Sequence, residues 1–221
     1  MRGTMLGLWA LLLSLQAAPG AAAEDKGWSV LSGTSVGAGH VALQLQGGWP
    51  DLSLGGYYGY NDKLDVGGRF AFSYGQDGSL GFGIATAPGF RFQASARYQL
   101  LSSGMLRLGA GFSPGFGVDF LPGVTTPRIL FPLQLVFGIV FSDKLMLHLG
   151  MDLALYATLP TAATTGGVTL PLLLGGGVEY ALDRSLAATG QLRIGPVLEI
   201  TRAGAPTHLA VQVTAGLAYR I

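Results

Sequence analysis

Apolar and polar side chains alternate with a period of two residues over most of this chain, from about Gly39 to Ile221. This is the period of a β-strand, in which successive side chains point to opposite faces. The last segment shows it most clearly, because every second residue from Leu209 onward is apolar, whereas the residues between them include Gln212 and Arg220. Backbone polar groups in such a chain can be satisfied in a closed barrel in lipid or in a packed core in water.

Composition favours the barrel. Charged residues make up 11% of the chain, where a soluble domain has roughly 25%, and hydrophobic residues make up 49%. Beyond residues 1–20, polar residues or glycines interrupt every apolar stretch well before the roughly 18 residues that a spanning helix needs. The chain also contains 36 glycines. We therefore predict an all-β fold, a transmembrane antiparallel up-and-down β-barrel.

The turns set the number of strands. Short polar turns, such as Asn61-Asp62-Lys63, alternate along the chain with connections that are mostly longer. This alternation is typical of a membrane barrel with short periplasmic turns and longer extracellular loops. It predicts ten strands with both ends on the periplasmic side, and the phase of residues 75–90 also allows eight or twelve. The expected strands are 39–49, 51–60, 64–74, 88–101, 105–117, 128–141, 145–156, 167–181, 185–197 and 208–221.

The first residues predict export. Arg2, an apolar stretch from Leu6 to Leu15 and the small residues Ala21-Ala22-Ala23 form the pattern of a cleavable signal peptide. We expect residues 1–23 to be this peptide, 24–38 to be a short N-terminal lead-in and 39–221 to be a single barrel domain. Cleavage would leave 12 basic residues of the original 13 against 12 acidic ones. A neutral chain does not favour nucleic acid as a partner.

Aromatic residues and prolines mark two levels of the expected barrel. Each descending strand carries an outward-phase aromatic near its periplasmic end, as expected for an interfacial belt: Tyr60, Tyr98, Phe141, Tyr180 and Tyr219. Proline cannot donate to a strand ladder. Six prolines lie at similar distances from the short turns and are expected at the outer rim: Pro50, Pro88, Pro114, Pro132, Pro171 and Pro196.

Two turn phrases, residues 60–66 and 141–147, resemble the aromatic, polar, Asp, Lys and Leu turns of the outer-membrane β-barrel superfamily. The final strand is similar to the C-terminal assembly signal of that superfamily, although it ends in Ile221 where members commonly end in Phe or Trp. The resemblance covers the whole mature chain. It implies a location in the bacterial outer membrane, contact with outer-membrane lipid, and assembly by the barrel-insertion machinery.

Charged residues on the inward phase are the main candidates for function. Six arginines face three acids there, a surplus of three positive charges: Arg69, Arg91, Arg97, Arg107, Arg193 and Arg220 against Asp65, Asp152 and Glu179. Arg97 and Arg107 are expected on adjacent strands, as are Glu179 and Arg193. Such charges must be paired with opposite charges or hydrated, because burying an unpaired charge is costly. The region is therefore either a salt-bridged plug or a water-filled passage.

Three functions from different classes fit this pattern. The first is a narrow channel or small-molecule transporter with a net positive lumen, for small ions or, through an apolar outer vestibule on the strands that contain Leu130, Tyr156 and Leu173, for small apolar molecules. The second is a structural or surface-interaction barrel with a closed, salt-bridged lumen. The third is an enzyme at the outer rim. We favour transport, with weak preference for anions.

Catalysis, metals and cofactors have little support in the sequence. Residues 33–37 and 111–115 match the Gly-X-Ser-X-Gly pattern, but no helix is expected after either, so the nucleophile geometry is missing. His40, His148 and His208 are far apart in the sequence, and cysteine is absent. We expect no catalytic residue, no metal site and no cofactor, and predict that the protein is not an enzyme.

Overall fold

The computed structural model describes residues 27–75, 88–162, 165–201 and 204–221. The expected signal peptide, residues 1–23, lies outside these residues. The described part contains eleven strands: β1 (Val41–Trp49), β2 (Asp51–Gly59), β3 (Leu64–Ser73), β4 (Gly89–Ser103), β5 (Leu106–Phe112), β6 (Gly115–Leu121), β7 (Val124–Val140), β8 (Leu145–Thr158), β9 (Gly167–Ala181), β10 (Leu186–Ile200) and β11 (Thr207–Arg220).

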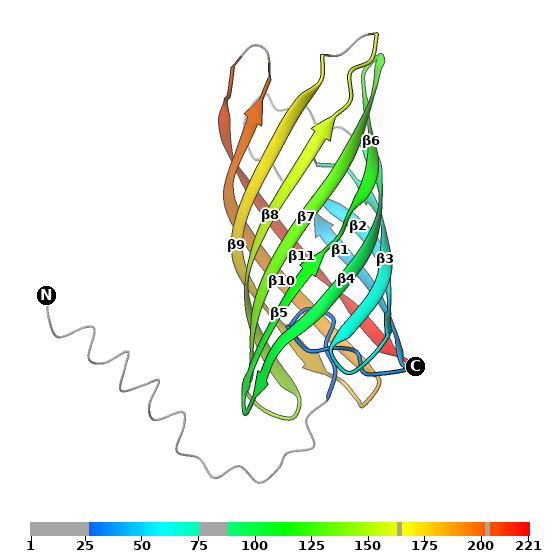
Figure 1. Ribbon diagram of the computed structural model, residues 1–221, viewed down its shortest axis with the longest axis vertical. Coiled ribbons are helices and arrows are strands. Elements are labelled where there is room, and N and C mark those ends of the chain that lie inside the picture. The colour runs from blue at the N-terminus through cyan, green and yellow to red at the C-terminus, as the bar shows by residue number, and fades with distance from the viewer. Residues whose placement is uncertain (1–26, 76–87, 163–164, 202–203) are drawn as a thin grey trace, which may run out of the picture.

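The strands form a closed antiparallel barrel with ten positions around its wall (Figure 1). Consecutive strands pair from β1 to β4 and from β7 to β11, and β1 closes the ring on β11. Strands β5 and β6 share one position, because both pair with β4 on one side and β7 on the other. They are the two halves of one strand, interrupted at Ser113 and Pro114. The all-β barrel of ten strands predicted from the sequence is confirmed.

Two expectations about the outer end are wrong. The predicted connection at residues 118–128 is a tight hairpin, in which β6 and β7 continue until Leu121 pairs with Val124. Gly123 has a φ of 76°, which suits the two-residue turn. Four prolines expected at the outer rim instead lie inside the wall, because the strands continue beyond them: Pro114, Pro132, Pro171 and Pro196. The backbone ladders are interrupted locally near these prolines. In the ladder between β9 and β10, for example, pairing stops after Ile194–Leu174 and resumes at Val197–Pro171.

The two faces of the wall differ as the alternation predicts. Outward residues such as Leu45, Leu149 and Leu174 are exposed, whereas inward residues such as Gln44 and Glu179 are buried. The lumen is therefore polar and the outer surface apolar. No helix in the described ranges is long and apolar enough to cross a membrane.

Candidate functional site

Residues 27–38 form a plug inside the barrel, at the end where the short turns and the C-terminus lie (Figure 1). These residues belong to the segment expected as a lead-in, residues 24–38. They contain no regular strand, and almost all of them are buried. The lumen is consequently filled at this end by residues 27–38 of the chain itself.

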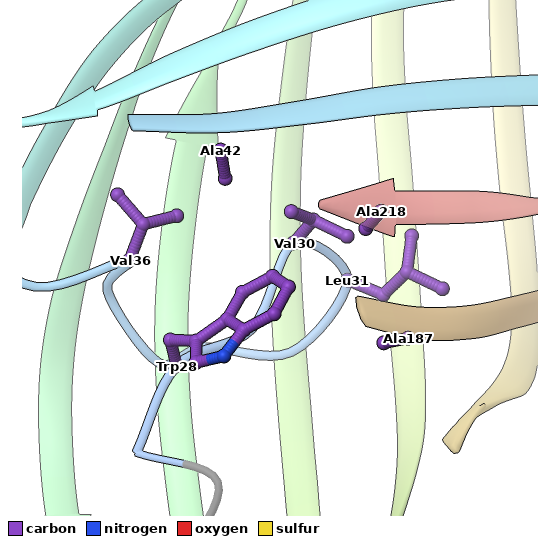
Figure 2. Close-up of a cluster of buried hydrophobic side chains, with 7 residues drawn as sticks. All are labelled: Trp28, Val30, Leu31, Val36, Ala42, Ala187 and Ala218. Carbon is purple, nitrogen blue, oxygen red and sulfur yellow. The ribbon is translucent and has the colours of Figure 1, made fainter. Parts of the chain in front are cut away.

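Apolar side chains fix one side of the plug against small wall residues. Trp28 and Val36 are fully buried and face Ala42, Ala187 and Ala218, which come from β1, β10 and β11 (Figure 2). Alanine at these inward positions leaves the room that the indole ring occupies. The Trp28 Nε1 group also donates a hydrogen bond of 3.0 Å to the carbonyl of Arg184. Arg220 lies over the same ring, with its guanidinium carbon 5.5 Å from the ring centre.

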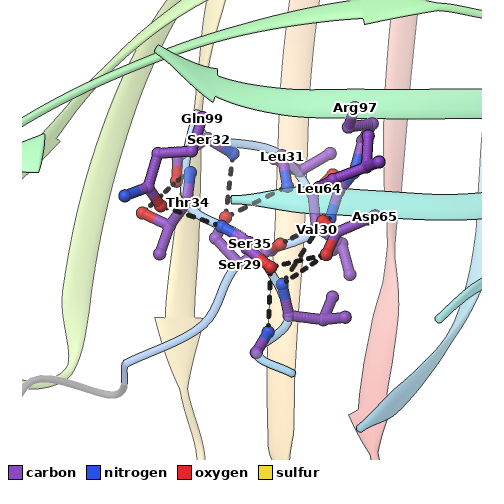
Figure 3. A network of polar contacts seen from close by, with 12 residues as sticks. Ser29, Val30, Leu31, Ser32, Thr34, Ser35, Leu64, Asp65, Arg97 and Gln99 are labelled. Carbon is purple, nitrogen blue, oxygen red and sulfur yellow. Dashed lines mark hydrogen bonds and ion pairs between the residues drawn. The ribbon is translucent and has the colours of Figure 1, made fainter. Parts of the chain in front are cut away.

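Arg97 and Asp65 hold the other side of the plug (Figure 3). The Arg97 guanidinium donates to the carbonyls of Val30 at 2.6 Å and Ser29 at 3.0 Å, and to Asp65 Oδ2 at 2.6 Å. Asp65 Oδ1 accepts from the Ser35 hydroxyl at 2.6 Å and the Val36 amide at 3.1 Å. The two wall residues form a buried ion pair, and each also bonds the plug directly. Such charge-assisted hydrogen bonds are stronger than neutral ones.

Glu179 and Gln99 add contacts from other strands. Glu179 Oε2 on β9 accepts from the Ser29 hydroxyl at 2.6 Å and the Leu31 amide at 3.3 Å. Gln99 Oε1 on β4 accepts from the Ser35 amide at 3.2 Å. The plug backbone, which has no strand ladder, thus finds its hydrogen-bond partners among side chains of the wall and among the plug's own serines, as where the Ser32 amide donates to the Ser29 hydroxyl.

Glycine allows the plug to touch the wall backbone directly. A Cβ atom added to Gly109 of β5 would lie 2.5 Å from the Cα of Gly33, and its three nearest atoms all belong to Gly33. By contrast, a Cβ added to Gly111, two residues along the same strand, would meet its first neighbour at 3.6 Å. The plug therefore requires glycine at 109 but not at 111.

A chamber of about 160 Å³ lies above the plug, which contributes Val30 and Leu31 to its floor. The apolar residues predicted to form an outer vestibule make one wall of it, since Leu130, Tyr156 and Leu173 all line it. Glutamine, serine, aspartate and arginine side chains from other strands also line it. The chamber is accordingly amphipathic, whereas the sequence suggested an apolar vestibule above a charged floor.

All nine predicted lumen charges lie on inward-phase positions of the strands, but few meet as expected. Asp65 pairs with Arg97, and Asp152 forms an ion pair with Arg193 across β9. Gly175 of β9 lies opposite Arg193 of β10. A Cβ added to Gly175 would be 2.8 Å from Arg193 Cγ, so the glycine leaves room for the Arg193 side chain to reach Asp152.

The residues expected to pair across adjacent strands make strong contacts elsewhere. Glu179 bonds the plug, and Arg97 bonds the plug while Arg107 donates to the carbonyls of Gly104 and Leu106 beside the β4–β5 turn. Arg91 lies with its guanidinium carbon 5.7 Å from the centre of the Tyr156 ring.

Four further charged residues face the lumen and were missed. Asp51 pairs with Arg69 at 2.8 Å, Asp119 pairs with Arg128 at 2.8 Å, and Glu199 faces inward near the outer end. Extending the strand alternation to the true strand ends would have found them. The predicted surplus of three positive charges is therefore too large. The described strands carry seven inward arginines and six inward acids, which leaves a surplus of one: Arg69, Arg91, Arg97, Arg107, Arg128, Arg193 and Arg220 against Asp51, Asp65, Asp119, Asp152, Glu179 and Glu199.

The five aromatic residues predicted as a belt are all exposed: Tyr60, Tyr98, Phe141, Tyr180 and Tyr219. They share one level near the plugged end. Tyr98, Tyr180 and Tyr219 pair with the first residues of β3, β8 and β10, and Tyr60 and Phe141 donate backbone hydrogen bonds to the first residues of β3 and β8. Their role at a lipid interface stays a prediction.

The three histidines do not assemble into one site. His208 Nδ1 is 4.0 Å from Glu199 at the outer end, His40 contacts the carbonyl of Ile221 at the opposite end, and His148 is buried in the wall. Within the described ranges, no group of three or more histidine, aspartate or glutamate residues is arranged to hold a metal ion. Ser35, in one of the two Gly-X-Ser-X-Gly matches, bonds Asp65 as part of the plug.

A closed antiparallel barrel with an apolar outer face, a polar lumen, short turns at one end and most longer connections at the other defines the class of this protein. It is a β-barrel of the transmembrane type, the architecture that outer-membrane proteins of bacteria have. No known family profile matches the chain, and no curated protein matches it in sequence.

Several solved structures are similar in fold. The outer membrane protease OmpT of Escherichia coli is 8% identical, with 82% of this chain and 96% of that chain covered and a TM-score of 0.48. The toluene transporter TodX of Pseudomonas putida is 11% identical over 81% of this chain and 70% of that chain, with a TM-score of 0.36. The attachment invasion locus protein Ail of Yersinia pestis is 12% identical over 83% and 99%, with a TM-score of 0.25.

Proposed function

We propose that this protein is a gated pore for small solutes, in which residues 27–38 are the gate. Solutes enter the chamber from the outer side and reach the periplasm when the plug leaves the lumen. One observation carries the proposal: the segment that closes the lumen is not part of the wall. It is held by side-chain hydrogen bonds to Arg97, Asp65 and Glu179 and by the packing of Trp28.

A gate of this kind can move without breaking the barrel. The wall strands are joined to each other around the whole ring by backbone ladders, and the plug contributes to none of them. Losing the plug contacts therefore leaves the ladder of the barrel intact. The proposal assigns no catalytic step to the protein and needs no cofactor.

The glycine contact gives a direct test. Alanine at position 109 must displace Gly33, because the added Cβ would overlap the plug backbone. In planar bilayers, Gly109→Ala is expected to show a steady conductance well above that of the unmodified protein. Gly111→Ala is the matched control, since it adds the same methyl group to the same strand without touching the plug, and it should behave like the unmodified protein.

The position of the plug is followed independently of conductance through the fluorescence of Trp28, which is fully buried in the plugged state. The measurement uses a Trp49→Phe background, because Trp49 at the end of β1 would also emit. A red-shifted emission in Gly109→Ala would report release of the plug. If the plug is released and the bilayer still carries no current, the proposed pore is wrong and a closed structural barrel is the better explanation.

A further inference from the structure

The chamber above the plug has two chemically different walls. Strands β7, β8 and β9 contribute apolar side chains, among them Leu130, Pro132, Ala154 and Leu173. Strands β1, β10 and β11 contribute uncharged polar side chains, among them Gln44, Gln46, Gln191 and Thr214. A ligand that fits both walls has one apolar face and several hydrogen-bonding groups on its other sides.

Glutamine dominates the polar lining. Six glutamines line this one chamber, on β1, β4, β7, β10 and β11: Gln44, Gln46, Gln93, Gln134, Gln191 and Gln212. An uncharged amide offers both donors and acceptors. Side chains of this type recognise groups that donate and accept in turn, such as hydroxyls.

Several of these polar atoms are buried without a partner in the described part of the chain. Gln44 and Gln46 are each only 5% exposed, yet neither Nε2 atom has a hydrogen-bond partner there. The same holds for Gln191 Oε1 and Thr214 Oγ1, which belong to directly paired residues of β10 and β11. Because leaving buried polar groups unpaired costs free energy, these chamber-lining side chains would gain from turning their amide and hydroxyl groups toward a hydrogen-bonding ligand.

The charges of the chamber point to a neutral ligand. Arg69 is bound to Asp51 at 2.8 Å and to the Ser53 hydroxyl at 3.0 Å, and Arg193 forms an ion pair with Asp152. These two pairs satisfy each other, and the third arginine of the lining, Arg91, lies with its guanidinium carbon 5.7 Å from the centre of the Tyr156 ring, so an anion or a cation would have to compete with existing contacts. A neutral ligand leaves both pairs in place.

We propose that the chamber binds a neutral polyhydroxylated ring of about the size of a monosaccharide. The proposal rests on the proposed pore, because it names the class of solute that the same chamber accepts. Ring hydroxyls bond the unpartnered amides of the polar wall, and the C–H face of the ring packs on the apolar wall. The chamber measures about 160 Å³, close to the volume of a cavity of about 150 Å³ that holds benzene, so its ligand has no more than one ring.

The test uses the purified full-length protein in detergent, with D-glucose as the probe and with toluene and benzoate as apolar and anionic probes of similar size. Saturation-transfer NMR titrations should show binding of glucose in preference to both. In Gln44→Leu/Gln46→Leu, which keeps the side-chain size, glucose affinity should fall by about tenfold or more, as expected for the loss of two hydrogen-bonding groups.

A matched control comes from Thr189 on β10, whose buried Oγ1 atom also has no partner in the described residues but which does not line the chamber. Thr189→Val should bind glucose as the unmodified protein does. The thermal midpoint of the double glutamine variant should not fall, because the amides removed have no partner in the protein.

Stronger binding of toluene or benzoate than of glucose would overturn the inference, and so would the absence of glucose binding or equal binding by the double variant. Failure of the pore itself looks different. If glucose binds but liposomes that contain Gly109→Ala do not swell in glucose, the site stands and the pore is wrong. If they swell with other solutes while glucose does not bind, the pore stands and the assignment of its solute is wrong.

Discussion

At the scale of single residues, the charges of the lumen act mainly as partners for one another and for the plug. Arg97 shows this most fully, because it bonds two plug carbonyls and Asp65, and its guanidinium carbon lies 4.3 Å from the centre of the Tyr57 ring. A charge buried in this way is stabilised by its neighbours rather than by water. The cluster therefore holds a structure in place, and its charge is not available to the solvent of a passage.

Asp65→Asn should loosen the plug. The amide has a single acceptor oxygen, so when that oxygen keeps the bonds to Ser35 and Val36, the NH2 group faces the Arg97 donors and the charge-assisted bond is lost. A hydrogen bond to a charged group contributes about 1.5 to 3 kcal/mol. We expect the emission of Trp28 to shift to the red and protease cleavage within residues 27–38 to become faster.

Asp119→Asn is the control for that substitution. Asp119 forms a similarly buried ion pair with Arg128 at 2.8 Å, on strands β6 and β7 and away from the plug. The Asp119→Asn variant should lower the thermal midpoint about as much as Asp65→Asn does, but it should leave the emission of Trp28 unchanged. Equal shifts in both variants would mean that the carboxylate of Asp65 supports the barrel in general and not the plug.

The sequence predicts the face on which each of these residues lies, but not its partner. Alternation alone identifies the inward phase of Asp65, Arg97 and Glu179, since it depends only on neighbours in the chain. Partners depend on strand register and on what else enters the lumen. The plug was the decisive missing element, because Glu179 bonds residues about 150 positions earlier in the chain.

At the scale of elements, the plug and the long strands differ in how much their sequences reveal. The wall strands have a strict period of two, and β9 spans residues 167–181 as predicted. Residues 27–38 have no period, so their sequence indicates only a lead-in. The interruption between β5 and β6 was hidden for a related reason: Pro114 breaks the ladder locally, but the alternation of side chains continues on either side of it.

A disulfide between the plug and the wall should lock the gate. A Cβ built on Gly138 of β7 lies 2.9 Å from the Cβ of Ser32, within about 1 Å of the separation typical of a disulfide. The native chain has no cysteine that could compete. We expect oxidised Ser32→Cys/Gly138→Cys to show no opening events in planar bilayers and to regain them when a reductant is added.

Ser32→Cys alone serves as the control for the lock, since it should respond to neither oxidant nor reductant. Gly138→Cys alone is not a control, because its Cβ would lie 2.9 Å from the Cβ of Ser32 and would displace the plug. Persistent conductance in a fully oxidised double variant would show that solutes pass without movement of the plug near Ser32. The gate would then have to be elsewhere in the lumen.

At the scale of the whole molecule, the barrel separates an apolar surface from a nearly neutral lumen. Its inward arginines and acids almost balance, and most of the acids lie close to an arginine. Only weak selection between small ions follows from such a balance, because a narrow space concentrates counter-ions according to its net charge. Arg97 is unsuitable for testing this selection, since replacing it would also release the plug.

Arg107 is the better probe of ion selectivity. It lies inward at the plugged end of the barrel, where it donates to the carbonyls of Gly104 and Leu106 beside the β4–β5 turn. In the open Gly109→Ala background, reversal potentials in a salt gradient should show a weak preference for anions, as a surplus of one positive charge requires. Adding Arg107→Glu changes the lumen charge by two units and should turn that preference toward cations.

Lys63→Glu makes the same change of charge in an exposed turn at the same end of the barrel and should alter the reversal potential much less. A marked cation preference before Arg107 is replaced, or an equal response to both glutamates, would show that the charges inside the lumen do not set the selectivity.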